Sequence, residues 1–231
     1  MMKFINYSLI ALNGLLVFSA CGQNSKNKNM KLTTEKDTVS YSLGANIATN
    51  LKQQGFDELD INVMAEAFKD VYESKDLKIT AEEGGMLINQ YMMKRQQAKG
   101  ANNVKIGQEF LDKKAKEEGV KKTASGLLYK VVQEGSGATP SATDKVTVHY
   151  TGKLIDGKVF DSSVERGQPA TFGVNQVIPG WTEALQLMKV GAKYQLFIPA
   201  NLAYGERGAG GDIGPNETLI FDVELISIEG K

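Results

Sequence analysis

Two patterns of hydrophobic and polar positions divide the chain. From about residue 39 to residue 120, apolar side chains recur every three or four positions, which is the spacing of one face of an α-helix. After Gly126 the period changes to two, as in β-strands that bury one face. The sequence therefore predicts an α+β fold, with a helical N-terminal region followed by a strand-rich C-terminal domain.

The helical region carries recognisable start and stop signals. One apolar stripe at i, i+4 spacing defines a first helix: Val39, Leu43, Ile47 and Leu51. Gly55 ends this stripe, and Asp60 stands where the N-cap of a second helix is expected. Thr80 and Glu83 have the spacing of a capping box, which indicates the start of a third helix.

The segment Lys99–Asn103, with the sequence KGANN, is expected to bend or break the third helix. Asn103 would then cap a last helix that closes at Gly119. Helices of this size bury too little surface for an independent monomeric domain, so they are predicted to form a homodimer through residues 38–100. The alternative is that their apolar stripes pack on the second half of the same chain.

The C-terminal half consists of β-rich runs separated by Gly, Pro, Asn and Asp. These runs are LLYKVV, VTVHYTG, KYQLFIP and TLIFDVELISI. Only Gly180–Lys189 has helical spacing, with apolar side chains at Trp181, Ala184, Leu185 and Met188. We therefore expect an antiparallel sheet wrapped around one short helix, and no nucleotide-binding α/β fold, because strands and helices do not alternate.

The first 20 residues have the pattern of an export signal, with Lys3 ahead of the apolar run Phe4–Phe18. This run is shorter than the roughly 20 residues that cross a bilayer. Cys21, the chain's single cysteine, follows it, and the arrangement resembles a bacterial lipoprotein signal in which Cys21 carries a lipid that holds the protein at a membrane. An unmodified thiol in an ordinary secreted protein is the alternative. Residues 21–37 are polar and are predicted to form a flexible tether.

Charge and residue usage exclude several classes of function. Lys plus Arg and Asp plus Glu both number 27, so there is no basic excess to bind nucleic acid. One histidine, one N-terminal cysteine and scattered carboxylates do not form a zinc site, so no metal is expected.

A hydrolase remains to be considered, because His149 precedes Asp161, Ser162 and Ser163. The chain has no G-x-S-x-G motif, and no helix begins after either serine to supply oxyanion donors. His149, Ser162 and Ser163 are therefore interpreted as structural residues of a strand hairpin.

Four segments resemble, in order, the signature of FKBP-type peptidyl-prolyl cis-trans isomerases across Gly126–Glu229. They are VTVHYTGKLIDGKVFDSS, VIPGW, LFIPANLAYGERGAGG and TLIFDVELISI. The upstream TVSYSLGANIATNLKQQG resembles the N-terminal dimerisation domain of the macrophage infectivity potentiator (Mip) branch of this family. The resemblance implies a helical dimerisation domain with a linking helix at 38–120 and an isomerase domain at 121–231, which follow the signal peptide predicted at 1–20 and the tether predicted at 21–37.

The resemblance also implies a substrate pocket with Trp181 as its floor, under a proline ring. Its walls would be formed by Tyr150, Phe160, Val177, Ile178, Ile213 and Phe221. The Tyr204 hydroxyl would bind a substrate carbonyl, the Ile178 N–H would bind the next one, and Asp161 would lie beside the twisting amide. Rotation about an Xaa-Pro bond breaks no bond and requires no cofactor.

The activity implied is isomerisation of Xaa-Pro bonds in exported, unfolded polypeptides of the bacterial cell envelope. Residues 22–29 contain no acidic cluster, which favours a position facing the periplasm over surface display. The expected location is the bacterial cell envelope, with the lipid anchor in the outer membrane. An alternative is a chaperone or interaction module that holds unfolded chains, with incidental isomerase activity. Adaptable apolar side chains such as Met92 and Met93 motivate this alternative.

Strand parity gives a separate test of the pocket, because alternate residues of a strand point to opposite faces. If Asp156-Gly157 forms a two-residue turn, Phe160 shares the face of His149. If Lys158 joins the loop, or if an equivalent bulge occurs, Phe160 shares the face of Tyr150. The predicted pocket requires the second arrangement.

Overall fold

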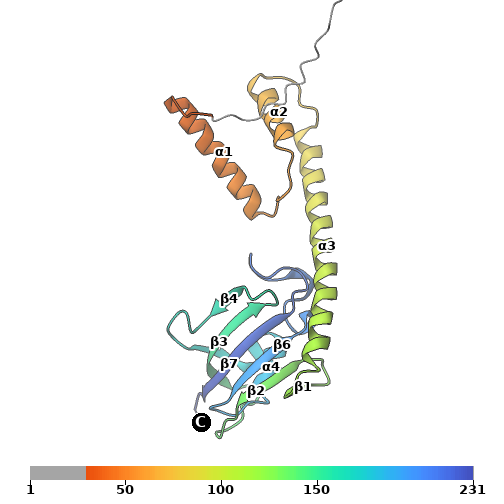
Figure 1. Ribbon diagram of the computed structural model, residues 1–231. Helices are drawn as coiled ribbons and strands as arrows, with labels where there is room; N and C mark the ends of the chain where they lie inside the picture. Colours follow the sequence, from red (N-terminus) through yellow and green to blue (C-terminus); the bar gives the residue numbers. More distant parts are fainter. Residues whose placement is uncertain (1–29, 231) are drawn as a thin grey trace, which may run out of the picture. The chain divides into compact units, whose positions relative to one another are not determined.

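A computed structural model describes residues 30–230 (Figure 1). The chain divides between Leu77 and Lys78 into two compact units. The predicted signal peptide, Cys21 and most of the predicted tether lie outside the described residues. Within residues 30–230, no helix combines the length and apolar character needed to span a membrane.

The first unit contains two helices, α1 (Glu35–Gln53) and α2 (Ile61–Tyr72). The helix α1 begins inside the segment predicted as tether, because Thr34 and Asp37 form a capping box at its start. The predicted N-cap at Asp60 is confirmed, since its carboxylate accepts hydrogen bonds from the second and third backbone N–H groups that follow it. Gly55, which follows α1, has a φ of 88°, a conformation that favours glycine.

The second unit begins with one long helix, α3 (Ala81–Lys114), and the predicted capping box of Thr80 and Glu83 is present at its start. The predicted break at 99–103 is wrong, because α3 continues through this segment without interruption. Gly100 is buried against Pro215, and the Asn103 side chain donates a hydrogen bond to the Pro215 carbonyl (2.9 Å). These tertiary contacts outweigh the weak helix propensity of KGANN. The helix also ends before the predicted Gly119.

Within the described residues, seven strands form one antiparallel sheet in the order β1-β2-β6-β7-β3-β4. The strands are β1 (Val120–Lys122), β2 (Leu128–Gln133), β3 (Lys145–Leu154), β4 (Val159–Ser162), β5 (Ala170–Gly173), β6 (Lys193–Ile198) and β7 (Leu219–Ile228). The first half of β3 pairs with β5, and its second half pairs with β4. The two short strands therefore extend the same edge of the sheet.

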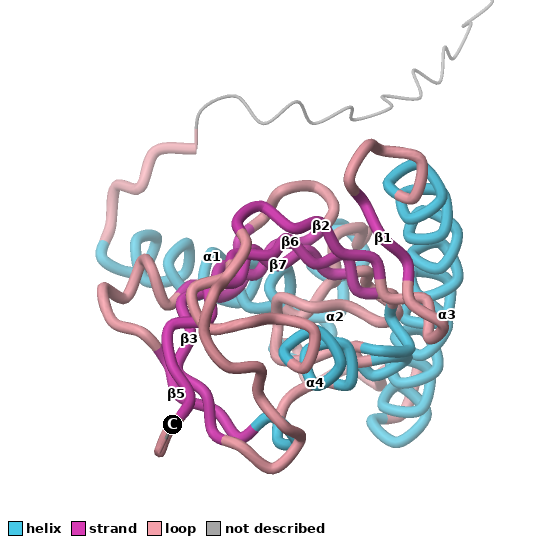
Figure 2. Tube along the Cα trace, turned by 90° about the horizontal axis from the view of Figure 1, so that it is seen from below, coloured by secondary structure: helices cyan, strands magenta, loops and turns pink. Residues whose placement is uncertain are grey.

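The sheet curves around a short helix, α4 (Pro179–Leu185), as Figure 2 shows. The predicted apolar face of this helix is buried in the main core, at Trp181, Ala184, Leu185 and the following Met188. Alternate residues of β3 and β7 complete this core. Three 3-10 turns, η1 (Val174–Gln176), η2 (Ala200–Leu202) and η3 (Gly205–Arg207), lie in the connecting segments. The predicted fold, an antiparallel sheet wrapped around one short helix, is confirmed.

Candidate functional site

A cavity of about 410 Å³ opens between the concave side of the sheet and α4. Side chains from β3, β4, β5, β7, η1, α4 and their connections line it: Tyr150, Phe160, Asp161, Phe172, Gln176, Val177, Ile178, Trp181, Tyr204 and Phe221. Most of these are aromatic or aliphatic. The cavity is therefore an apolar pocket with a few polar groups at its edge.

A β-bulge brings two consecutive residues of β4 to this pocket. Gly152 of β3 pairs with Asp161, but Lys153 pairs with Val159, so Phe160 is the extra residue. Both Phe160 and Asp161 line the cavity together with Tyr150. The arrangement that the pocket requires, with Phe160 on the Tyr150 face, is therefore present, and a bulge produces it.

The aromatic rings pack edge to face around the Trp181 indole. The ring centroids of Tyr150 and Phe221 lie 5.3 and 5.2 Å from that of Trp181, with interplanar angles of 88° and 81°. Phe172 lies at 5.9 Å and 85°, and Phe160 meets Phe221 at 5.5 Å and 84°. Each ring is thereby held by at least one other ring, which makes the pocket a rigid surface.

The polar edge of the pocket is organised by Arg166. Its guanidinium contacts the Asp161 carboxylate and donates to the Tyr150 hydroxyl (3.0 Å), and that hydroxyl donates to the same carboxylate. The guanidinium carbon also lies 5.7 Å from the centre of the Tyr150 ring. Arg166 holds the orientation of Asp161 through this network.

Burial and these contacts set the protonation of the site. Burial raises the pKa of Tyr150 and Tyr204, so both hydroxyls keep their protons at neutral pH. Burial alone would also raise the pKa of Asp161, but hydrogen bonds from Tyr150 and Arg166 outweigh it and lower that pKa below the ordinary 3.8. Asp161 is therefore a carboxylate at neutral pH.

At least three donors in the pocket have no partner among residues 30–230, and one of them is the buried indole N–H of Trp181. The backbone N–H of Ile178, which precedes α4, makes no hydrogen bond within the described chain, and neither does the Tyr204 hydroxyl. Tyr204 is 41% exposed. The pocket thus presents the Ile178 N–H, the Tyr204 O–H and the Trp181 indole N–H to whatever fills it.

The structure brings together every predicted pocket residue except Ile213. This side chain is buried at 8% exposure in the core, and its backbone bridges to Ala209. The sequence reasoning missed Phe172, Gln176 and Arg166. Phe172 lies in a short alternating run that could have indicated an inward-facing ring, whereas Arg166 lies in a turn with no periodic pattern.

His149 and the two serines play structural roles. The Ser163 hydroxyl, fully buried, lies 3.1 Å from His149 Nδ1 and accepts the Tyr150 N–H at 2.8 Å. Ser162 is paired with the hydroxyl of Thr151 at 2.9 Å. Both serines thus join strand β3 to the end of β4. Nowhere in the described chain do three or more His, Cys, Asp or Glu side chains gather as a metal site would require.

An apolar aromatic pocket with free donors, and with no Ser, Cys, Thr, Lys or His among its lining residues, fits a protein that binds an apolar ring beside an amide. Comparison with known proteins identifies the family. Residues 137–226 match the FKBP-type peptidyl-prolyl cis-trans isomerase domain, and residues 36–131 match the domain amino terminal to it.

Among individual relatives, the outer membrane protein MIP of Legionella longbeachae is 46% identical over 86% of this chain and 88% of its own length. The FKBP-type 22 kDa peptidyl-prolyl cis-trans isomerase of Escherichia coli K12 is also 46% identical, over 82% of this chain and 94% of its own. The crystal structure of FkpA from Escherichia coli matches with a TM-score of 0.69 at 36% identity, covering 86% of this chain and 98% of that one.

The chain belongs to the FKBP-type peptidyl-prolyl cis-trans isomerases. Its relatives carry Mip and FkpA names, as the resemblance of its N-terminal segment implied. The predicted isomerase activity is thereby confirmed, and the alternative of a holding protein with incidental activity is not favoured.

Proposed function

We propose that the aromatic pocket binds the Xaa-Pro segment of an unfolded polypeptide, with the proline ring on Trp181. Tyr150, Phe160, Val177 and Phe221 would surround this ring. The observation that carries the proposal is the convergence of these rings with the unpartnered Tyr204 O–H and Ile178 N–H in one cavity. The Tyr204 hydroxyl and the Ile178 N–H would hold successive carbonyl groups of the substrate.

The chemistry of rotation explains why such a pocket would accelerate it. The barrier of about 18–20 kcal/mol comes from amide resonance, which places negative charge on oxygen and positive charge on nitrogen. The twisted transition state loses this charge separation. An apolar pocket therefore destabilises the planar ground state more than the twisted transition state, which lowers the barrier to rotation.

Asp161 would add a fixed negative charge at the edge of the pocket. A carboxylate beside the amide oxygen disfavours the charge that resonance places there, and this charge is largest in the planar form. The contacts from Arg166 and Tyr150 hold the carboxylate in place, so it need not reorganise during rotation.

The proposed roles are tested by the rate of isomerisation of an Xaa-Pro tetrapeptide. Tyr204→Phe removes only one hydroxyl, and we expect kcat/KM to fall about 3- to 10-fold, as for a lost hydrogen bond of roughly 1 kcal/mol. The matched control is Tyr72→Phe, because Tyr72 is 84% exposed on α2, outside the pocket. Equal rates in the two variants would contradict the donor role of Tyr204.

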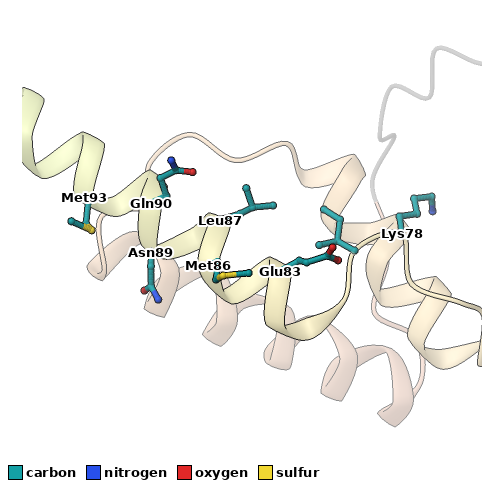
Figure 3. A pocket seen from close by; sticks show the side chains of 8 residues that line it. Lys78, Glu83, Met86, Leu87, Asn89, Gln90 and Met93 are labelled. Atoms are coloured by element: carbon teal, nitrogen blue, oxygen red, sulfur yellow. The ribbon is translucent and has the colours of Figure 1, made fainter.

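We further propose that the protein works as a homodimer through residues 38–100. Its support is exposed apolar surface: α1 has no buried residue, and Ile47, Leu51 and Phe68 line a groove that α1 and α2 form within the first unit. A second groove of about 790 Å³ runs along the start of α3, where Met86, Leu87 and Met93 line it (Figure 3). Such surfaces in a folded protein commonly mark an interface.

Light scattering on a soluble chain that begins at residue 22, after the predicted lipid site, tests this pairing. We expect the mass of two chains, and Leu43→Asp or Met86→Asp should shift the mass towards one chain, because both side chains are exposed on the described chain. A mass of one chain for the unmodified protein would contradict the proposal.

The proposed location is the bacterial envelope, with a lipid on Cys21, in the outer membrane facing the periplasm. Exported, unfolded, proline-containing polypeptides would then be the substrates. The outer-membrane name of one relative supports this location. Fractionation of cells that express the full chain or Cys21→Ser tests it: we expect the serine variant to leave the membrane fraction, and an unchanged distribution would argue against lipidation.

A further inference from the structure

The C-terminal half of α3 packs against the loop that follows Tyr204. The residues that face this loop and the neighbouring strands recur at intervals of three or four: Gly100, Asn103, Gly107, Leu111 and Lys114. This spacing forms one continuous stripe on the helix. The helix thus contacts the isomerase domain along several turns (Figure 1).

Two glycines allow the helix backbone to approach the loop closely. A Cβ atom added at Gly107 would lie 2.4 Å from Oγ1 of Thr218, a side chain that is 3% exposed. A Cβ atom at Gly100 would lie 3.4 Å from Cβ of Pro215. The helix and the segment 215–218 therefore fit together without space for a larger residue at Gly107.

Hydrogen bonds continue this contact to the edge of the pocket. Asn103 Nδ2 donates to the Pro215 carbonyl (2.9 Å), and the next residue, Asn216, donates its backbone N–H to the Gly205 carbonyl (2.8 Å). Asn216 has a φ of 56°, in the left-handed region, which few residues other than glycine adopt. Gly205 directly follows Tyr204, so two hydrogen bonds separate α3 from the residue that carries the pocket hydroxyl.

The loop 205–218 needs this support because its glycines can adopt many backbone conformations. Gly205, Gly208 and Gly210 all adopt positive φ. Besides the Asn216–Gly205 bond and the contacts with α3, the contacts that hold the loop are a short bridge between Ala209 and Ile213, a bond from the Gly208 N–H to the Gly205 carbonyl (3.3 Å) and an exposed ion pair of Asp212 with Lys158. Glycine-rich segments sample many conformations unless other contacts fix them. A donor that stabilises a transition state must be held in place before the substrate arrives.

We propose that Asn103 and Gly107 are positioning residues for Tyr204: α3 braces the loop 205–218 and thereby fixes the pocket hydroxyl. This inference rests on the proposed donor role of Tyr204. It assigns to α3, the first helix of the second unit, a direct effect on the rate of isomerisation.

A separate cluster keeps α3 docked when the brace is removed. Phe110 meets Phe197 at 5.9 Å, Leu111 packs with Leu128, and Lys114 Nζ lies 5.1 Å from the Phe197 ring centre. This cluster is distinct from the core around α4. A substitution at Asn103 is therefore expected to loosen the loop while the helix stays on the sheet.

The test compares Asn103→Ala with Asn102→Ala in the full mature chain, because Asn102 is the neighbouring asparagine and is exposed. We expect Asn103→Ala to lower kcat/KM for an Xaa-Pro tetrapeptide about 3- to 10-fold, and Asn102→Ala to leave it unchanged. In a Tyr204→Phe background, Asn103→Ala should cause no further loss, since its effect passes through the hydroxyl.

Gly107→Ala provides a second perturbation, with Gly85→Ala as its control, because a Cβ at Gly85 meets nothing within 4 Å. We expect the first to reduce kcat/KM at least as much as Asn103→Ala, and the second to have no effect. Thermal unfolding shows whether each variant folds. If Gly107→Ala does not fold, the comparison of Asn103→Ala with Asn102→Ala tests the inference alone.

Equal rates for Asn103→Ala and Asn102→Ala would overturn the inference. It would also be overturned if the losses from Asn103→Ala and Tyr204→Phe multiply, because a purely packing role acts independently of the hydroxyl. A Tyr204→Phe variant with the wild-type rate is a different result, since it removes the donor role on which the inference rests.

Discussion

Gly152 on β3 is the position where the smallest change should disturb the pocket most. A Cβ atom there would lie 2.6 Å from the tip of the Phe160 ring and 2.7 Å from an edge carbon of Phe221. Carbon atoms in contact are comfortable at about 3.5–4.0 Å, so each ring would have to move by about 1 Å. Gly152→Ala therefore adds one methyl group between two walls of the site.

The rings have little freedom to make this movement. Phe160 and Phe221 pack edge to face at 5.5 Å, and Phe221 packs against the buried Trp181 at 5.2 Å. Overpacking of this kind costs about 1–3 kcal/mol of folding free energy. For a chain of this size that corresponds to a decrease in Tm of roughly 2–4 °C per kcal/mol. A displacement of about 1 Å at the reacting group can also lower the rate about 100-fold.

The assay is kcat/KM for an Xaa-Pro tetrapeptide together with the thermal unfolding curve. Gly85→Ala is the matched control, because a Cβ there meets nothing within 4 Å and its backbone does not require glycine. We expect Gly152→Ala to lose activity by at least about 10-fold while it still folds. A variant with wild-type activity and wild-type Tm would refute the reasoning that Gly152 makes room for the rings.

Three further outcomes are expected. Because the pKa of Asp161 is lowered in the folded protein, its contribution to stability is complete above about pH 3.8 and is lost as pH falls through the folded pKa. In denaturant titrations the free energy of unfolding of the wild type should therefore exceed that of Asp161→Asn by a constant amount near pH 7. This difference should shrink below pH 3.8. Arg166→Leu should reduce kcat/KM about 3- to 10-fold, and Arg166→Lys should not restore it, because one ammonium lacks the planar fork that contacts both Asp161 and Tyr150; full activity in either variant would contradict this role. Trp181→Ala should lower the free energy of unfolding by about 3–5 kcal/mol, and a loss below about 1 kcal/mol in urea titration would show that Trp181 is not a packed floor.

The caps and stripes of the helices could be read from the sequence because their signals are local. The continuity of α3 through KGANN could not, because Gly100 and Asn103 are weak helix formers whose contacts lie more than 100 residues away in the chain. Tertiary contacts therefore determine that this segment is helical.

The pocket could be predicted only in part, for a similar reason. The Asp156-Gly157 sequence was compatible with two registers, and the bulge that brings Phe160 and Asp161 to one face is a property of the pairing with β3. Arg166 lies in a turn without periodicity, so its contacts with Tyr150 and Asp161 depend on how β4 ends. By contrast, the helical spacing of its neighbours places Trp181 on the buried face of α4, although only the resemblance to the family indicated that it forms the pocket floor.

The proposal that this cavity is the isomerase site is tested most directly by Phe160→Ala, measured as kcat/KM on an Xaa-Pro tetrapeptide beside His149→Gln. Phe160 lines the cavity and His149 lies on the other face of the same hairpin. We predict a loss of at least about 10-fold for Phe160→Ala and wild-type activity for His149→Gln. Wild-type activity in a folded Phe160→Ala variant would contradict the assignment of the cavity as the site of proline isomerisation.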